Sequence, residues 1–148
     1  MLLETLVYTA VLVVILGMAI LAYDRFAVYS QRLRAVTADI SRTVDAGERW
    51  REDIRKAIAP IQFDEKSGEL RIPQEGVEVS YRFQDGEVVR REGERSVPVL
   101  AHVKHSAMQQ VPRAHVVSWR WEVELKTRGK NAKVQPLFQF EAVAPGKS

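Results

Sequence analysis

His102 and His105 form the only close pair of histidines in the sequence, and histidine pairs can bind metals. A zinc site needs three or four ligand side chains that converge on one point. In a strand, residues three positions apart point to opposite faces of the sheet. No cysteine is present, and no paired acid nearby completes a ligand set. We therefore expect neither a metal site nor a bound cofactor.

The groups that could act as nucleophiles or acid–base catalysts also lack the necessary neighbours. Ser118 is not flanked by the glycines of a nucleophile elbow. Glu122 and Glu124 alternate with apolar residues, and we expect them to balance Arg120 and Lys126 across neighbouring strands. The scattered glycines form no phosphate-binding motif. The sequence therefore predicts no catalytic residues, and we do not expect an enzyme.

Trp119 and Trp121 could form a platform on which the bases of single-stranded nucleic acid stack. However, they alternate in phase with Val123 and Leu125, so all four share one strand face. Aromatic and branched residues on one face are typical of a half-buried sheet. The net charge is only +3 and both signs are mixed along the chain. We therefore expect these tryptophans in a core, and no nucleic-acid partner.

Glu4 is an acid at the start of an apolar run that extends to Tyr23. A charged side chain inside the bilayer costs at least a few kcal/mol, and such acids usually pair with a cation. No basic residue of this chain lies within reach of Glu4. In one interpretation, the acid merely complements the helix dipole at the membrane surface. In the other, it pairs with a cation of another subunit, such as an N-terminal amine.

The apolar run from Thr5 to Tyr23 carries no charge over about 19 residues, near the length that crosses a bilayer as a helix. A secretory signal peptide would have a basic start and a cleavage site, and this run has neither. We therefore expect an uncleaved anchor. Arg25, Arg32 and Arg34 follow the run. Taken alone, these charges would place the following domain in the cytoplasm.

Beyond the anchor, apolar residues recur at helical spacing between charged residues, which predicts an amphipathic continuation of the same helix to about residue 59. After Pro60 the period changes to two, which predicts antiparallel strands. Asp85-Gly86 between two alternating segments is a strong hairpin signal. The expected strands are Ile61–Phe63, Glu69–Ile72, Val77–Phe83, Glu87–Arg90, Val97–Val103, His115–Lys126 and Lys133–Val143, with a turn at 128–131 and Pro136 favouring a sheet edge.

These elements predict an α+β fold, with a long N-terminal helix packed on an antiparallel meander sheet of about five to seven strands. The expected parts are a transmembrane segment (1–23), an amphipathic helix (24–59), a sheet domain (60–144) and a frayed tail (145–148). The apolar stripe of the helix should cover the apolar face of the sheet. The expected helix–sheet core comprises Leu33, Ile40, Trp50, Ile54, Tyr81, Trp119 and Trp121.

The stretch 2–17, LLETLVYTAVLVVILG, resembles the start of type IV pilins, and in particular of the minor pseudopilins of type II secretion. Three further stretches are similar to the J-type minor pseudopilins: 50–54 at the end of the helix, 79–81 with its tyrosine, and 85–91 with its turn and basic strand. The resemblance implies a pilin-like fold and a structural subunit of a secretion or pilus filament. It also implies other pilin subunits and the inner membrane as partners, and a sheet domain in the periplasm.

Members of this family carry a basic leader that ends in glycine and is removed by a prepilin peptidase, after which the new amine is methylated. The sequence contains no such leader, so either the true start lies upstream, or the leader was left out, or the protein is unprocessed. We expect a leader upstream, which would also resolve the orientation conflict. The resemblance implies that assembly uses Glu4, Leu6, Val13 and Gly17. The alternative is a single-pass anchored domain that binds a ligand or partner in the periplasm and forms no filament.

Overall fold

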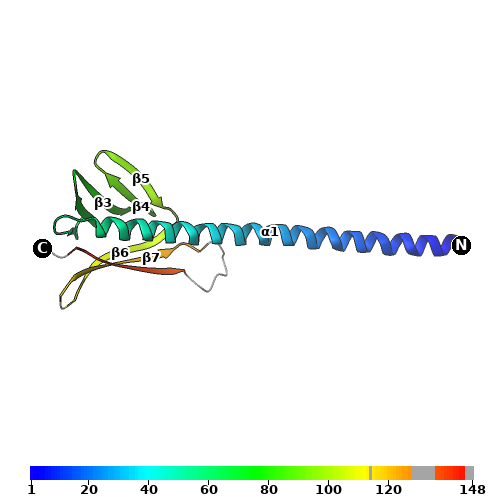
Figure 1. Ribbon diagram of the computed structural model, residues 1–148. Coiled ribbons are helices and arrows are strands. Elements are labelled where there is room, and N and C mark those ends of the chain that lie inside the picture. Colours follow the sequence, from blue (N-terminus) through cyan, green and yellow to red (C-terminus); the bar gives the residue numbers. More distant parts are fainter. Residues whose placement is uncertain (114, 128–135, 146–148) are drawn as a thin grey trace. The chain divides into compact units, whose positions relative to one another are not determined.

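A computed structural model describes residues 1–113, 115–127 and 136–145 of the chain. Helix α1 (Leu2–Arg55) comes first and is followed by strands alone in these residues (Figure 1). The chain divides into two compact units, Met1–Ile40 and Ser41–Ser148. The boundary between the two units falls within α1. It therefore divides the predicted amphipathic segment 24–59, which we expected to be a single part of the chain.

The first unit is helical and its side chains are largely exposed. An 18-residue window of α1 has a mean hydropathy of 2.5, and none of that window is buried. No proline occurs in this stretch to interrupt the backbone hydrogen bonds of the helix. The helix is therefore long and apolar enough to cross a membrane.

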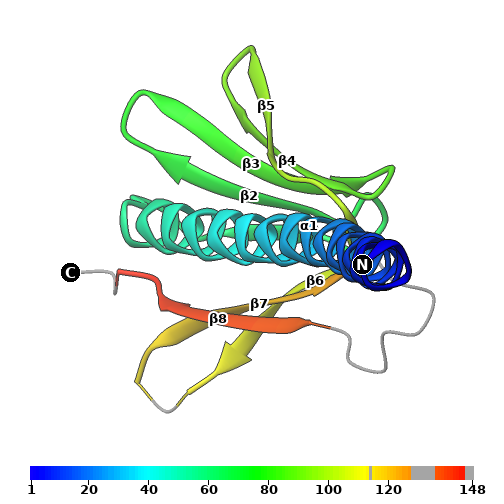
Figure 2. The same cartoon turned by 90° about the vertical axis from the view of Figure 1, so that its right-hand side faces the viewer.

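The second unit contains the end of α1 and two antiparallel sheets, so the fold is α+β as predicted. Figure 2 shows the two sheets on opposite sides of the helical segment 41–55. The strands of the larger sheet, in order, are β1 (Gln62–Asp64), β2 (Glu69–Gln74), β3 (Val77–Gln84), β4 (Glu87–Glu92) and β5 (Arg95–Leu100). Those of the smaller sheet are β6 (Val103–Pro112), β7 (Val117–Leu125) and β8 (Leu137–Val143).

The β3–β4 hairpin forms at the predicted turn. Asp85 and Gly86 have φ angles of 54° and 81°. Positive φ at both central residues matches the twist of the flanking strands, and aspartate followed by glycine tolerates it best. Val79 then pairs with Glu92, and Gln84 with Glu87. This register points Val79 and Tyr81 into the core, where both are fully buried.

We expected a single meander sheet of about five to seven strands, and this prediction is wrong in the number of sheets and in the number of strands. The described residues form eight strands in two sheets, and the expected strand Val97–Val103 is divided between β5 and β6. His102 lies between them with a φ of 60°, so it is not in a strand. This bend ends β5 and lets β6 pair with β7.

Other boundaries shift by a few residues. The helix ends at Arg55 and not near 59, because the backbone turns there and the N–H of Ile58 donates to the carbonyl of Pro73 in β2 (2.9 Å). Strand β8 lies at a sheet edge, as Pro136 predicts. The predicted turn 128–131, the start of the last strand at 133–135 and the tail residues 146–148 lie outside the described residues.

Candidate functional site

Glu4 lies in the first turn of α1 and is exposed. Among the described side chains, no ion pair includes it. The helix N-terminus carries a partial positive charge that favours an acid at this position. The geometry of the chain therefore leaves Glu4 available to a cation from outside.

The other predicted assembly residues lie on one face of the helix. Spacings of seven and four separate Leu6, Val13 and Gly17, which places them above one another at 3.6 residues per turn. Leu6 and Val13 are exposed, and a Cβ added to Gly17 would meet no other atom within 4 Å. By the same helical geometry Glu4 lies on the opposite face. A partner that contacts all four residues must therefore surround the helix.

The predicted helix–sheet core is partly found. The structure buries Trp50, Ile54, Tyr81, Trp119 and Trp121, all in the second unit. Leu33 and Ile40 differ from the prediction, because they are 51% and 40% exposed and lie in the first unit. Spacing on a helix shows that a residue belongs to an apolar stripe, but it does not show which part of the stripe is covered.

Trp121 is the centre of the core. Its ring centroid lies 5.8 Å from that of Trp50, 6.2 Å from that of Tyr81 and 5.6 Å from that of Phe140. These tilted arrangements join the helix to both sheets. Trp119 is also buried, on the same strand. Neither tryptophan presents a free ring face, so they are not suited to stacking with bases.

Helix α1 approaches β8 closely at Gly47. A Cβ at this position would overlap the ring of Phe140. One turn later, the Arg51 guanidinium lies over the same ring, 5.4 Å from its centroid, and its Nε donates to the carbonyl of Glu141. The glycine and the arginine together set how deeply the helix sits on the smaller sheet.

A buried ionic cluster, which the sequence alone did not reveal, fixes the last turns of α1 to the larger sheet. Asp53 is 4% exposed and accepts hydrogen bonds from Arg90 Nε (2.7 Å), Arg90 Nη2 (3.1 Å), the Tyr81 hydroxyl (2.7 Å) and Gln74 Nε2 (3.1 Å). Arg90 also pairs with Glu92 (2.6 Å). The only sequence signal was an acid next to the apolar stripe, between Trp50 and Ile54.

The cluster favours one protonation state. Burial alone would raise the pKa of Asp53, but hydrogen bonds from Arg90, Tyr81 and Gln74 outweigh it and lower that pKa below its usual value of 3.8. Burial, together with the hydrogen bond to Asp53, raises the pKa of the Tyr81 hydroxyl. The hydrogen bond to Asp53 raises the pKa of Arg90 despite its partial burial. Asp53 and Arg90 are therefore both charged at neutral pH.

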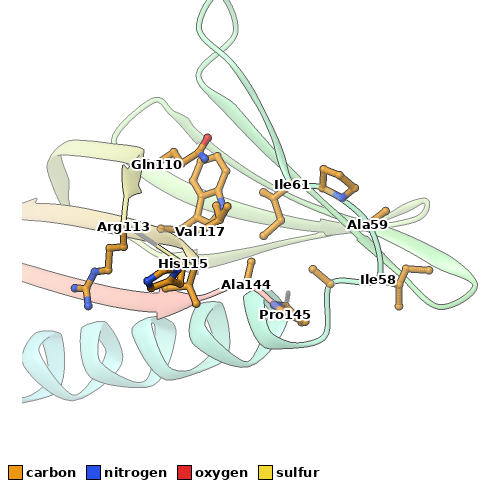
Figure 3. Close-up of a pocket in the computed structure, with 13 residues that line it drawn as sticks. Ile58, Ala59, Ile61, Gln110, Arg113, His115, Val117, Ala144 and Pro145 are labelled. Carbon is orange, nitrogen blue, oxygen red and sulfur yellow. The ribbon is translucent and has the colours of Figure 1, made fainter. Parts of the chain in front are cut away.

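A pocket of about 560 Å³ lies beside the end of α1 in the second unit (Figure 3). One wall is the chain that leaves the helix, from Ala57 to Ile61, and Val117 and Trp119 of β7 contribute to another. Arg113 lines it too, but its guanidinium points away from Ile58 and Ile61 and bonds to Glu141 (2.8 Å). The buried indole N–H of Trp119 has no acceptor among the described residues. This pocket is mainly apolar, with few polar groups.

The described residues contain no group of three or more side chains that could hold a metal ion. His105 lies on β6 and is exposed, whereas His102 lies in the bend before that strand. Ser118 is buried and donates to the carbonyl of Val111 (2.9 Å). This bond gives Ser118 a structural role in the β6–β7 pairing.

Comparison with known proteins gives no relative of the chain: no family model, no curated protein and no solved structure matches it. The function must therefore be argued from the residues and geometry above.

Proposed function

We propose that this protein is a structural subunit of a pilin-like filament, of the minor pseudopilin kind used in type II secretion. The observation that carries the proposal is helix α1, which bears an acid in its first turn and runs from an exposed apolar half into a half covered by sheets. In this proposal, the apolar half serves first as a membrane anchor and later as part of a helical filament core.

The energetics of transfer support such a dual role. Lipid tails and neighbouring apolar helices are similar environments, so little hydrophobic free energy changes when the helix moves between them. Packing and polar pairing then decide which arrangement forms. Glu4 provides the polar part, because leaving one member of a buried ion pair unpaired costs several kcal/mol. In the proposed filament, Glu4 pairs with the methylated amine of a neighbouring subunit and sets the axial register.

The location follows from the same proposal. Before assembly into the filament, the protein resides in the inner membrane with its second unit in the periplasm, after a prepilin peptidase has removed a basic leader. The reading frame upstream of Met1 tests this part: an in-frame basic leader ending in glycine supports it, and an in-frame stop codon contradicts it. In our proposal the sheets act by presenting a surface to other subunits.

The decisive experiment compares Glu4→Gln, which removes the charge but keeps the shape, with Asp45→Asn, which removes an exposed acid from the later part of α1. Both variants should remain membrane-inserted and folded, as shown by membrane fractionation and by cooperative unfolding of the second unit. Only Glu4→Gln should fail to co-purify with the other pilin-type proteins of the cell. Normal incorporation of Glu4→Gln would exclude the pairing.

The pocket supports one alternative, a membrane-anchored domain that binds a small apolar ligand and forms no filament. Its volume and apolar lining are in the range of ligand sites. Val117→Arg would fill the pocket, so it should abolish ligand binding if this alternative holds, whereas Glu4→Gln should leave ligand binding unchanged.

A further inference from the structure

Four strands lie at the edges of the two sheets, and the backbone of three of them offers little to an added strand. β1 has only three residues. The N–H of Gly93 donates to β3, and because bonding alternates along a strand, Val89 bonds to β3 as well. Its partner Pro98 in β5 therefore points its backbone outward, and proline has no N–H to donate. In β8, the carbonyl of Glu141 already accepts a hydrogen bond from Arg51.

Strand β6 differs from these three, and it has ten residues. The N–H of Leu125 donates to the carbonyl of Pro136, so odd-numbered residues of β7 bond to the β8 side and even-numbered residues bond to β6. The register pairs those even-numbered residues with odd-numbered residues of β6. The N–H and C=O groups of Ser106, Met108 and Gln110 therefore point to the open side, where no other described segment bonds to them.

The pocket beside the end of α1 adjoins this free edge. Gln110 and its partner on β7, Trp119, both line the pocket, and Ile61 lies on another part of its wall (Figure 3). In an added strand, the residue opposite Gln110 would place its side chain on the same face of the sheet as Gln110. That face is the one that borders the pocket. Free backbone groups along an edge, together with a pocket for one side chain, are the features of sites that bind extended peptides by strand addition.

The charges along β6 indicate the character of the added chain. The sequence from Arg95 to Trp121 contains no aspartate or glutamate. Lys104 lies near the start of β6 and Arg113 follows its end, and both side chains are half-exposed. Their acidic partners, Glu124 and Glu141, lie on β7 and β8, away from the free edge. A chain alongside β6 therefore meets basic groups at both ends, which favours an acidic chain.

A second copy of this protein fits the edge poorly. Only one antiparallel register uses all three outward-pointing residues of both copies, and in it Met108 pairs with its equivalent. Lys104 of one copy then lies opposite Pro112 of the other, next to Arg113. Like charges on facing strands are destabilising.

We propose that β6 binds an extended segment of another protein as an added strand, with a large apolar side chain of that segment in the pocket and acidic side chains near Lys104 and Arg113. The pocket volume of about 560 Å³ accommodates an aromatic side chain. This binding requires neither Glu4 nor a filament, so it goes beyond the proposed function. It also differs from the small-ligand alternative, because the hydrogen bonds of the edge supply part of the affinity.

The experiment measures binding of a dye-labelled peptide to the full-length chain in lipid nanodiscs by fluorescence anisotropy. The probe, with blocked termini, is Glu-Phe-Thr-Val-Thr-Val-Glu. In an antiparallel added strand its phenylalanine lies opposite Gln110, and its two glutamates lie near Arg113 and Lys104. Replacing both glutamates of the peptide by lysine should weaken binding about tenfold.

Two methylated peptides test the hydrogen bonds of the edge. Methyl groups on the backbone nitrogens of both valines remove donors that face β6, whereas methyl groups on those of both threonines point away from it. The valine-methylated peptide should bind at least about tenfold more weakly than the probe. The threonine-methylated peptide, which carries the same number of methyl groups, should bind almost as well as the probe.

Variants of the protein provide the matching test. Gln110→Pro removes an outward N–H, whereas Gln110→Ala keeps it, so only the proline variant should bind the probe about tenfold more weakly. Val117→Arg fills the pocket and should weaken binding similarly, and Val97→Arg, at an exposed position on β5, should not. Cooperative unfolding of the second unit confirms that each variant is folded.

Several results would overturn the proposal: no saturable binding of the probe, equal binding of the two methylated peptides, or a lysine peptide that binds as tightly as the probe. Binding that depends on Val117 but not on methylation would assign the pocket to a free ligand. Self-association that Gln110→Pro abolishes would assign the edge to a second copy. Glu4→Gln should bind the probe normally, so failure of either proposal leaves the other standing.

Discussion

Arg90 holds Asp53 through two hydrogen bonds, from Nε to Oδ2 (2.7 Å) and from Nη2 to Oδ1 (3.1 Å), and so joins the last turns of α1 to β4. Tyr81 and Gln74 donate further hydrogen bonds to the same carboxylate. The carboxylate is buried, so removing one member of the pair leaves an uncompensated charge.

The first prediction concerns the stability that depends on this pair. Arg90→Ala should lower the free energy of unfolding of the second unit by about 3 kcal/mol, because Asp53 would stay buried without its cation. Arg71→Ala breaks the ion pair between Arg71 and Glu69, in which the arginine side chain is 46% exposed. This variant should lower the free energy of unfolding by less than about 1 kcal/mol. Denaturant unfolding followed by tryptophan fluorescence measures both. Equal costs would contradict the assigned role of Asp53.

The second prediction is a pH dependence. The folded pKa of Asp53 lies below its unfolded value, so its ionised form stabilises the fold at pH above the unfolded pKa, and this stability is lost as pH falls through the folded pKa. Asp53→Asn removes the titration. The difference in unfolding free energy between the unchanged chain and the variant should therefore be constant above about pH 5 and shrink toward pH 3. A difference that grows on acidification would refute the assignment.

The third prediction uses the close approach of α1 to β8. An alanine in place of a helical glycine normally stabilises a helix by about 1 kcal/mol. At Gly47 the added Cβ overlaps the Phe140 ring, so Gly47→Ala should instead destabilise the second unit by about 1–3 kcal/mol. Phe140→Leu should partly rescue it by making room. Gly17→Ala, where the space is open, is the control and should not change this unfolding transition.

Local patterns in the sequence were enough to predict the elements that depend on them. The unbroken apolar run predicted the first half of α1, and Asp85-Gly86 predicted the β3–β4 hairpin. Strand β6 was missed because its burial does not alternate: Lys104 and His105 are both exposed, and a register shift lies between Val103 and His105. Without β6, the division into two sheets could not be foreseen.

The candidate site shows the same limit. Glu4 is conspicuous in the sequence because it is a charged residue at the start of a long apolar run, and a charge inside the bilayer is costly. The pairing of Asp53 with Arg90 depends on how the helix end meets the sheet register, and residues 37 positions apart give no sign of it. The exposure of Leu33 and Ile40 could not be foreseen either, because helical spacing assigns a residue to an apolar stripe without showing whether that part of the stripe is covered.

The last prediction concerns the independence of the second unit. Its buried apolar core begins at Ala46, and every member of that core lies between Ala46 and Ala142. A chain that begins at Arg25 lacks the apolar run and should stay soluble and unfold in one cooperative thermal transition. A chain that begins at Trp50 loses Gly47 and the buried Thr43 and Ala46, and should unfold at lower temperature. Calorimetry compares the two, and a broad, non-cooperative transition in the longer chain would show that the second unit needs the apolar helix to fold.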